Sequence, residues 1–193
     1  MRYLNSRSWK RSAILFFSLL LTLGAAASSF AASSQQVPAR DSAGYEARLT
    51  KQVRHELVML PFYSVFDNLQ YKVEGGKVTL LGQVTRPALK SDAEGAVKHI
   101  EGVETVDNQI EVLPPSPNDD RIRRATFRAV YSSPSLEMYA LRSVPTIHII
   151  VDRGHVTLEG SVARESDKNV AGIQANTVPG AFSVTNNLRV DNT

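Results

Sequence analysis

The chain has 193 residues and no cysteine. A chain without cysteine forms no disulfide, carries out no thiol redox chemistry and offers no thiolate ligand to zinc. It also lacks the residue that is acylated in a bacterial lipoprotein, so we expect a protein that is not a lipoprotein. Packing alone must therefore stabilise whatever domains it forms.

Catalytic and metal-binding patterns are also missing. No histidine has a second histidine three or four residues away, and the P-loop, G-x-S-x-G and H-E-x-x-H patterns do not occur. Asp119 and Asp120 could suggest a metal pair, but they precede a helical pattern, where acidic residues cap free N–H groups. We expect no enzymatic activity, no metal and no cofactor.

The sequence has one long apolar run, residues 13–23. Four basic residues precede it and the small-x-small triplet Ser29-Phe30-Ala31 follows. This order is typical of a secretory signal peptide cleaved after Ala31, so we expect the mature protein to be exported. The alternative is an uncleaved anchor, although the run falls short of the ~20 residues of a spanning helix.

Removal of this leader changes the charge. The precursor has 22 basic and 19 acidic residues and a net charge of +3. Four of the basic residues and none of the acidic ones lie in the leader, so the mature chain has a net charge of −1. The basic character of the precursor therefore gives no reason to expect nucleic acid as a partner.

A long internal repeat dominates the remaining chain. Residues 73–84 return as residues 151–162, an offset of 78 that continues without a gap to the end of the chain. Before residue 73 the offset is 73, so the second copy has five extra residues between its first helix and first strand. The hydrophobic periods in each copy follow the order α-β-β-α-β, which predicts a parallel pair for the second and third strands.

We therefore predict an α+β protein of two tandem modules, each with a small mixed three-stranded sheet packed by two helices. The predicted segments are a signal peptide (1–31), a flexible tether (32–44), module 1 (45–113), a proline-rich linker (114–117) and module 2 (118–193).

Four glycines occupy matching places in the two copies. Gly76 and Gly154 lie in the hairpin turns, and Gly82 and Gly160 lie inside the second strands. A strand glycine is costly, so we expect it to permit close approach of a helix, or a bulge. The alternative is a ligand that lies against the bare backbone.

The repeated V-x-x-G-x-V-T-L-x-G-x-V core, the α-β-β-α-β order and the G-V/A-x-x-V-x-N-x-I/L-x-V ending resemble the BON domain (bacterial osmotically inducible and nodulation). The resemblance covers nearly all of residues 45–191. It implies a dual-BON protein of the bacterial cell envelope with a binding role, commonly towards phospholipid membranes and in maintaining the envelope.

The first helix of module 2 carries the predicted binding site. At 100° per residue, Ile122 and Val130 fall on the core side, and cations and aromatic rings gather on the other. The predicted lipid-binding residues are Arg123, Arg124, Phe127, Arg128 and Tyr131. Arginines suit phosphate, and aromatic rings suit the headgroup boundary. The alternative is that Phe127 and Tyr131 pack against module 1.

Two helix-to-strand loops are apolar, residues 61–66 and 136–141. We expect them to cap the open ends of the two small cores, with partner binding as the alternative. The overall prediction is a periplasmic protein that binds anionic phospholipid membranes, mainly through module 2. The alternative is a chaperone-like or adaptor protein whose partner is another envelope protein.

Overall fold

A computed structural model describes residues 39–142 and 144–191. Both modules lie in one compact unit, residues 37–193. The predicted signal peptide and residues 32–38 of the predicted tether lie outside the described residues. The described part of the tether differs from the prediction, because residues 39–44 belong to the first helix.

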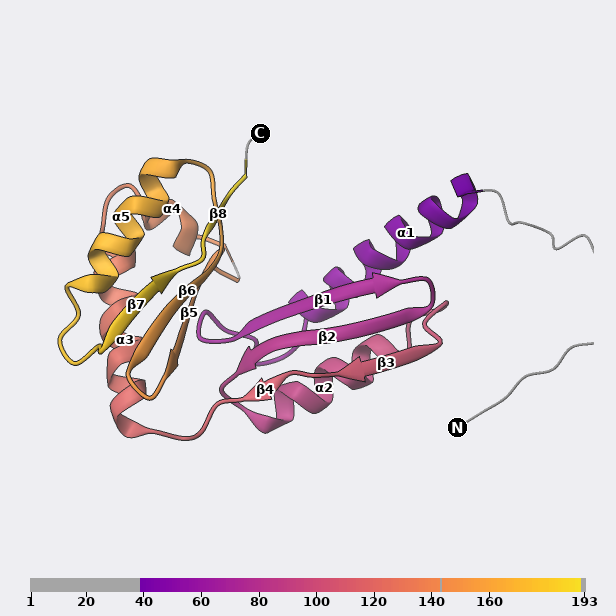
Figure 1. The fold of residues 1–193 in the computed structure, drawn as a ribbon, viewed down its shortest axis with the longest axis horizontal. Coiled ribbons are helices and arrows are strands. Elements are labelled where there is room, and N and C mark those ends of the chain that lie inside the picture. Colours follow the sequence, from indigo (N-terminus) through magenta and orange to yellow (C-terminus); the bar gives the residue numbers. More distant parts are fainter. Residues whose placement is uncertain (1–38, 143, 192–193) are drawn as a thin grey trace, which may run out of the picture. The chain divides into compact units, whose positions relative to one another are not determined.

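Module 1 has the expected order of elements (Figure 1). Its elements are α1 (Ala39–Val58), β1 (Asn68–Glu74), β2 (Lys77–Val84), α2 (Pro87–Lys98), β3 (Thr105–Asn108) and β4 (Glu111–Val112). The last predicted strand is divided into β3 and β4, and both pair with β2.

Module 2 repeats this order with one addition. Its elements are α3 (Pro117–Tyr131), α4 (Glu137–Ala140), β5 (Ile147–Asp152), β6 (His155–Val162), α5 (Glu165–Asn176), β7 (Ser183–Asn186) and β8 (Arg189–Val190). The short helix α4 lies in the segment where module 2 has its five extra residues.

The two sheets have the same mixed topology. The central strand of each, β2 or β6, pairs antiparallel with the strand before it and parallel with the strands after it. The second helix of each module makes the crossover that a parallel pair requires. The fold prediction is confirmed, including the parallel pair.

Each module has its own hydrophobic core. Leu49, Val53 and Leu57 of α1 pack with α2 and the sheet in module 1, and Ile122 and Val130 of α3 do the same in module 2. The spacing of these residues puts them on one side of each helix. One residue crosses the boundary: Val65, from the loop between α1 and β1, belongs to the core of module 2.

The strand glycines Gly82 and Gly160 have backbone φ angles of +107° and +111°. A Cβ at these positions would stand 2.0 Å from the carbonyl oxygens of Asn68 and Thr146. Asn68 begins β1 and Thr146 directly precedes β5, so both oxygens lie on the segment that pairs antiparallel with the glycine's own strand. The expectation of a close helix is therefore wrong, and the glycine accommodates the backbone of the adjacent strand segment.

The hairpin glycines differ between the modules. Gly154 has φ +81° and follows Arg153 at φ +49°, so both turn residues of module 2 are left-handed. In module 1 the left-handed residue is Gly75, at φ +58°, and Gly76 is not among the positive-φ residues. The tight turn at Gly75 and Gly76 is present as predicted.

We predict that Gly160→Ala lowers the free energy of unfolding by about 1–3 kcal/mol or more. Alanine is strained at a φ of +111°, and its Cβ would meet the Thr146 carbonyl oxygen. Gly95→Ala in α2 is the matched control, since a Cβ there meets nothing within 4 Å. It should be neutral or stabilise by up to about 1 kcal/mol. Thermal and denaturant unfolding measure both variants. Equal stability of the two would contradict this assignment.

Candidate functional site

The predicted site lies on α3, whose start is well specified. Ser116 is the N-cap residue, and its hydroxyl accepts a hydrogen bond from the Asp119 amide at 3.2 Å. Pro117 occupies the first turn, where its missing N–H costs nothing. The proline-rich linker thus runs directly into the helix.

Asp119 has a different role from the predicted cap. Its side chain is buried and accepts hydrogen bonds from the amides of Arg153 (3.1 Å) and Gly154 (2.8 Å). It therefore fixes the β5–β6 turn against the start of α3. Glu46, its counterpart at the offset of 73, accepts from the Gly75 amide at 2.9 Å. The repeat could have identified this pair.

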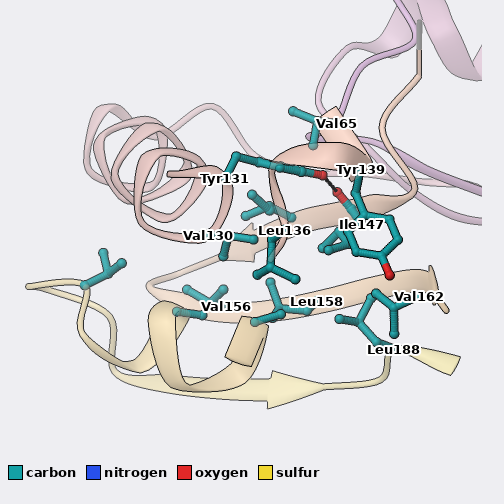
Figure 2. Close-up of a cluster of buried hydrophobic side chains, with 14 of the residues drawn as sticks. Val65, Val130, Tyr131, Leu136, Tyr139, Ile147, Val156, Leu158, Val162 and Leu188 are labelled. Atoms are coloured by element: carbon teal, nitrogen blue, oxygen red, sulfur yellow. Dashed lines mark hydrogen bonds between the residues drawn. The ribbon is translucent and has the colours of Figure 1, made fainter. Parts of the chain in front are cut away.

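Tyr131 is buried, and the prediction that it faces outward is wrong. Its ring lies in the core of module 2, and its hydroxyl donates to the Ile147 carbonyl at 2.6 Å (Figure 2). Burial raises the pKa of the hydroxyl well above its usual range. The helical wheel assigned this side of α3 to solvent. In the structure it is covered at the last turn of the helix, both by β5 and by the loop of module 1 that contains Val65.

Arg123 is buried as well, with 4% of its surface exposed. One guanidinium nitrogen contacts Asp120 Oδ1 at 2.7 Å, and the other terminal nitrogen donates to the Val151 carbonyl at 2.6 Å. This arginine joins α3 to β5 and is not free to meet a phosphate. Its place in the predicted lipid-binding set is corrected.

Phe127 is half-buried between the two modules. Its ring centroid lies 4.9 Å from that of Tyr131 and 6.2 Å from that of Phe66, with the Phe66 contact edge-to-face. Such pairs contribute about 0.5–1.5 kcal/mol beyond area burial. The structure therefore has the alternative arrangement, in which these rings pack against module 1.

Arg124 and Arg128 remain exposed as predicted, and Arg121 joins them. Their spacing of three and four residues places them along one side of α3. In the part of the chain that the structure describes, none of the three has an acidic group within 4.0 Å. We call these three residues the arginine row.

A short segment of module 1, residues 63–67, makes the contact with β5, and we call it the docking loop. The Val65 carbonyl accepts a hydrogen bond from the Ile149 amide at 2.8 Å. Tyr63 stacks on His148, with ring centroids 5.6 Å apart. The burial of Tyr63 raises the pKa of its hydroxyl to about 12.

Asp67 holds the docking loop in shape. It is 1% exposed and accepts four hydrogen bonds. Two come from the amide and hydroxyl of Ser64, and two come from the amide and hydroxyl of Thr85. A buried carboxylate is stable only with such partners, so this network ties the loop to the start of α2.

The apolar loop of module 2 caps its own core as predicted, since Leu136 and Tyr139 pack there. The loop of module 1 departs from the prediction: Tyr63 packs against the core of module 1, but Val65 packs into the core of module 2. The tips of the loops are not covered: Phe62 is 68% exposed and Leu141 is 80% exposed.

The described residues include no group of three or more metal-binding side chains. An open cleft of about 950 Å³ has Arg54, Arg142 and Arg189 in its wall together with Glu159 and Asp191. Its charges are mixed, and we found no convergent set of reactive groups among these lining residues.

The family comparison agrees with the repeat. The BON domain matches residues 45–114 and again residues 118–192. The chain belongs to the BON domain family. It carries two BON domains in tandem, and BON domain proteins are associated with the cell envelope.

Two solved structures of CdsD, a structural protein of the type III secretion system of Chlamydia trachomatis, also resemble the chain. One, of the C-terminal domain, is 12% identical, with a TM-score of 0.30, and the match covers 74% of this chain and 96% of that one. The other is 13% identical, with a TM-score of 0.28, covering 73% and 91%. Neither likeness bears on function. No curated protein matches the chain, and no described helix is long and apolar enough to cross a membrane.

The contact of His148 with the docking loop predicts a pH dependence of stability. Burial lowers the pKa of His148 below 6.5, with Asp67 acting in the opposite direction. The unfolded chain therefore takes up this proton at a higher pH than the folded chain. The stability that neutral His148 contributes is fully present above about pH 6.5, and it is lost as the pH falls from there through the lower pKa of the folded state.

His148→Phe keeps a ring against Tyr63 and removes the titration. We expect the free energy of unfolding of the wild type to fall more steeply than that of His148→Phe between about pH 7.5 and 5.5. Denaturant unfolding across this range measures both slopes. Parallel slopes would show that His148 is not buried as described.

Proposed function

We propose that this BON domain protein is a periplasmic envelope-maintenance protein that binds anionic phospholipid membranes through module 2. The arginine row carries the proposal. Arg121, Arg124 and Arg128 are exposed on one side of α3, and the opposite side of the helix is buried in the core. A helix with this division of charge is suited to lie against an anionic surface.

The length and charge of the row fit a lipid surface. At a rise of 1.5 Å per residue, Arg121 and Arg128 are about 10 Å apart along the helix axis. A basic residue near an anionic membrane contributes about 1 kcal/mol. Three such residues give binding that is weak for one molecule and sensitive to salt.

Module 1 presents a less favourable surface at the matching positions. The residues at the offset of 73 are Arg48, Lys51 and His55. Arg48 lies over the ring of Tyr45, with 5.7 Å to the centroid. At the third position a histidine replaces the arginine. This difference supports module 2 as the main contact.

A protein partner is the second candidate function, and the exposed side chains of the α4 segment favour it. Met138 is 60% exposed and Leu141 is 80% exposed. Exposed apolar side chains near one another are typical of interaction surfaces. In this case the protein would act as an adaptor or chaperone-like module in the envelope.

The double charge reversal Arg124→Glu with Arg128→Glu tests the lipid proposal. Loss of two cations alone should weaken binding to anionic vesicles by at least about thirty-fold, and the new negative charges add to this. Both residues are exposed, so stability should change by no more than about 0.5 kcal/mol each. Sedimentation of the chain from residue 32 to 193 with phosphatidylglycerol-containing vesicles is the measurement.

Lys51→Glu with Arg54→Glu is the matched control, since it makes the same change of charge on α1. This control should retain most of the vesicle binding. If both double variants lost binding equally, net charge and not the arginine row would be responsible. Wild-type binding that did not distinguish anionic from neutral vesicles would contradict the proposed function.

A further inference from the structure

One aromatic ring of module 2 faces solvent where two loops meet. Phe182 is 76% exposed and precedes β7. Its amide donates a hydrogen bond to the Gly154 carbonyl at 2.8 Å, which ties it to the β5–β6 turn. Figure 1 shows this turn, the α5–β7 loop and the start of α3 at the same end of module 2.

The Phe182 ring packs over Gly154, a residue without a side chain. A Cβ on Gly154 would stand 2.7 Å from Phe182 Cδ2, so the ring lies directly over the glycine backbone. The His155 ring lies on another side, with 5.9 Å between centroids. These contacts fix where the ring points while most of its surface stays exposed.

Two arginines belong to the segments that adjoin the ring. The Arg153 side chain is 80% exposed, and Arg121 Nη2 lies 3.0 Å from where a Cβ on Gly180 would stand. Two acidic groups of the adjoining segments have partners of their own, since Asp119 accepts the turn amides and Asp120 pairs with Arg123. A third, Asp152, has its Oδ1 atom 3.9 Å from Arg153 Nε, a long contact to an arginine side chain that is largely exposed. Arg121 is also the first member of the arginine row, so the two surfaces are continuous.

Module 1 shows that the fold does not require this ring. The same backbone hydrogen bond occurs there, from the Glu104 amide to the Gly76 carbonyl at 2.7 Å. Glu104 thus stands in place of Phe182, and Gly75 stands in place of Arg153. The aromatic ring and its arginine are therefore features of module 2 alone.

We propose that this tip is the point at which module 2 enters a membrane: Phe182 inserts at the boundary between headgroups and acyl chains, while Arg121 and Arg153 contact lipid phosphates. This inference rests on the proposed function and adds the insertion point to it. An anionic lipid surface fits better than a protein groove, because a single ring among cations matches a layer of phosphates above an apolar interior.

The test uses the chain from residue 32 to 193, which contains the whole compact unit. Phe182→Ser should weaken binding to vesicles of phosphatidylglycerol and phosphatidylcholine by about 10- to 100-fold, as expected for loss of one buried phenyl ring. Ile173→Ser is the matched control, because Ile173 is 63% exposed on α5. It should bind like the wild type, and both variants should melt like the wild type.

Phe182→Trp gives a direct signal of insertion. The sole tryptophan of the sequence is Trp9, so residue 182 would hold the one tryptophan of this shortened chain. Its fluorescence should shift to shorter wavelength when anionic vesicles are added, and brominated lipid should quench it. As a converse, Glu104→Phe should strengthen vesicle binding by module 1.

The outcomes separate the two proposals. If the wild type binds anionic vesicles, but Phe182→Ser binds equally well or the tryptophan emission does not change in the bound protein, the insertion point is wrong and the arginine row stands. If the wild type does not bind these vesicles, both proposals fail. Loss of a co-purifying protein by Phe182→Ser, with vesicle binding intact, would assign the tip to a protein partner and overturn this inference.

Discussion

The rest of the structure depends on the contact between the docking loop and β5. The Val65 carbonyl takes the Ile149 amide as its partner, and the Val65 side chain completes the core of module 2. Because module 1 covers this strand, β5 is buried over nearly its whole length. The two BON domains are therefore not independent, and the first supplies part of the core of the second.

This contact decides which part of α3 meets solvent. It buries Tyr131 and half-buries Phe127, so the aromatic residues of the helix stabilise the fold and the arginine row is the surface that remains. The ring of module 2 that remains exposed is Phe182, on a different loop, where we propose the insertion point. Module 1 thus contributes to the core of module 2, and the proposed binding surfaces both lie on module 2.

The sequence was sufficient for the fold because the repeat shows every element twice, with turn glycines and period changes at the same places. The sequence did not predict the site correctly, because a helical wheel identifies one buried side of a helix and assigns all other residues to solvent. Tyr131 and Arg123 lie at the edges of that division, where contacts with β5 determine whether a side chain is buried.

One signal in the sequence indicated that β5 is covered. Residues 147–151 form an almost continuous apolar run, whereas residues 69–73 alternate, and such a run is typical of a strand covered on both faces. Asp67 gave no signal, since its four partners come together only in the fold.

The central claim is that the docking loop of module 1 packs into module 2, and a double-mutant cycle on Phe66 and Phe127 tests it most directly. Their rings meet across the modules at 6.2 Å between centroids. The free energies of unfolding of Phe66→Ala, Phe127→Ala and the double variant, measured by denaturant unfolding, give the coupling between the two rings. We predict a coupling of about 0.5–1.5 kcal/mol, so that the double variant loses less stability than the sum of the single variants. Strictly additive losses would mean that the rings do not touch, and would contradict the account.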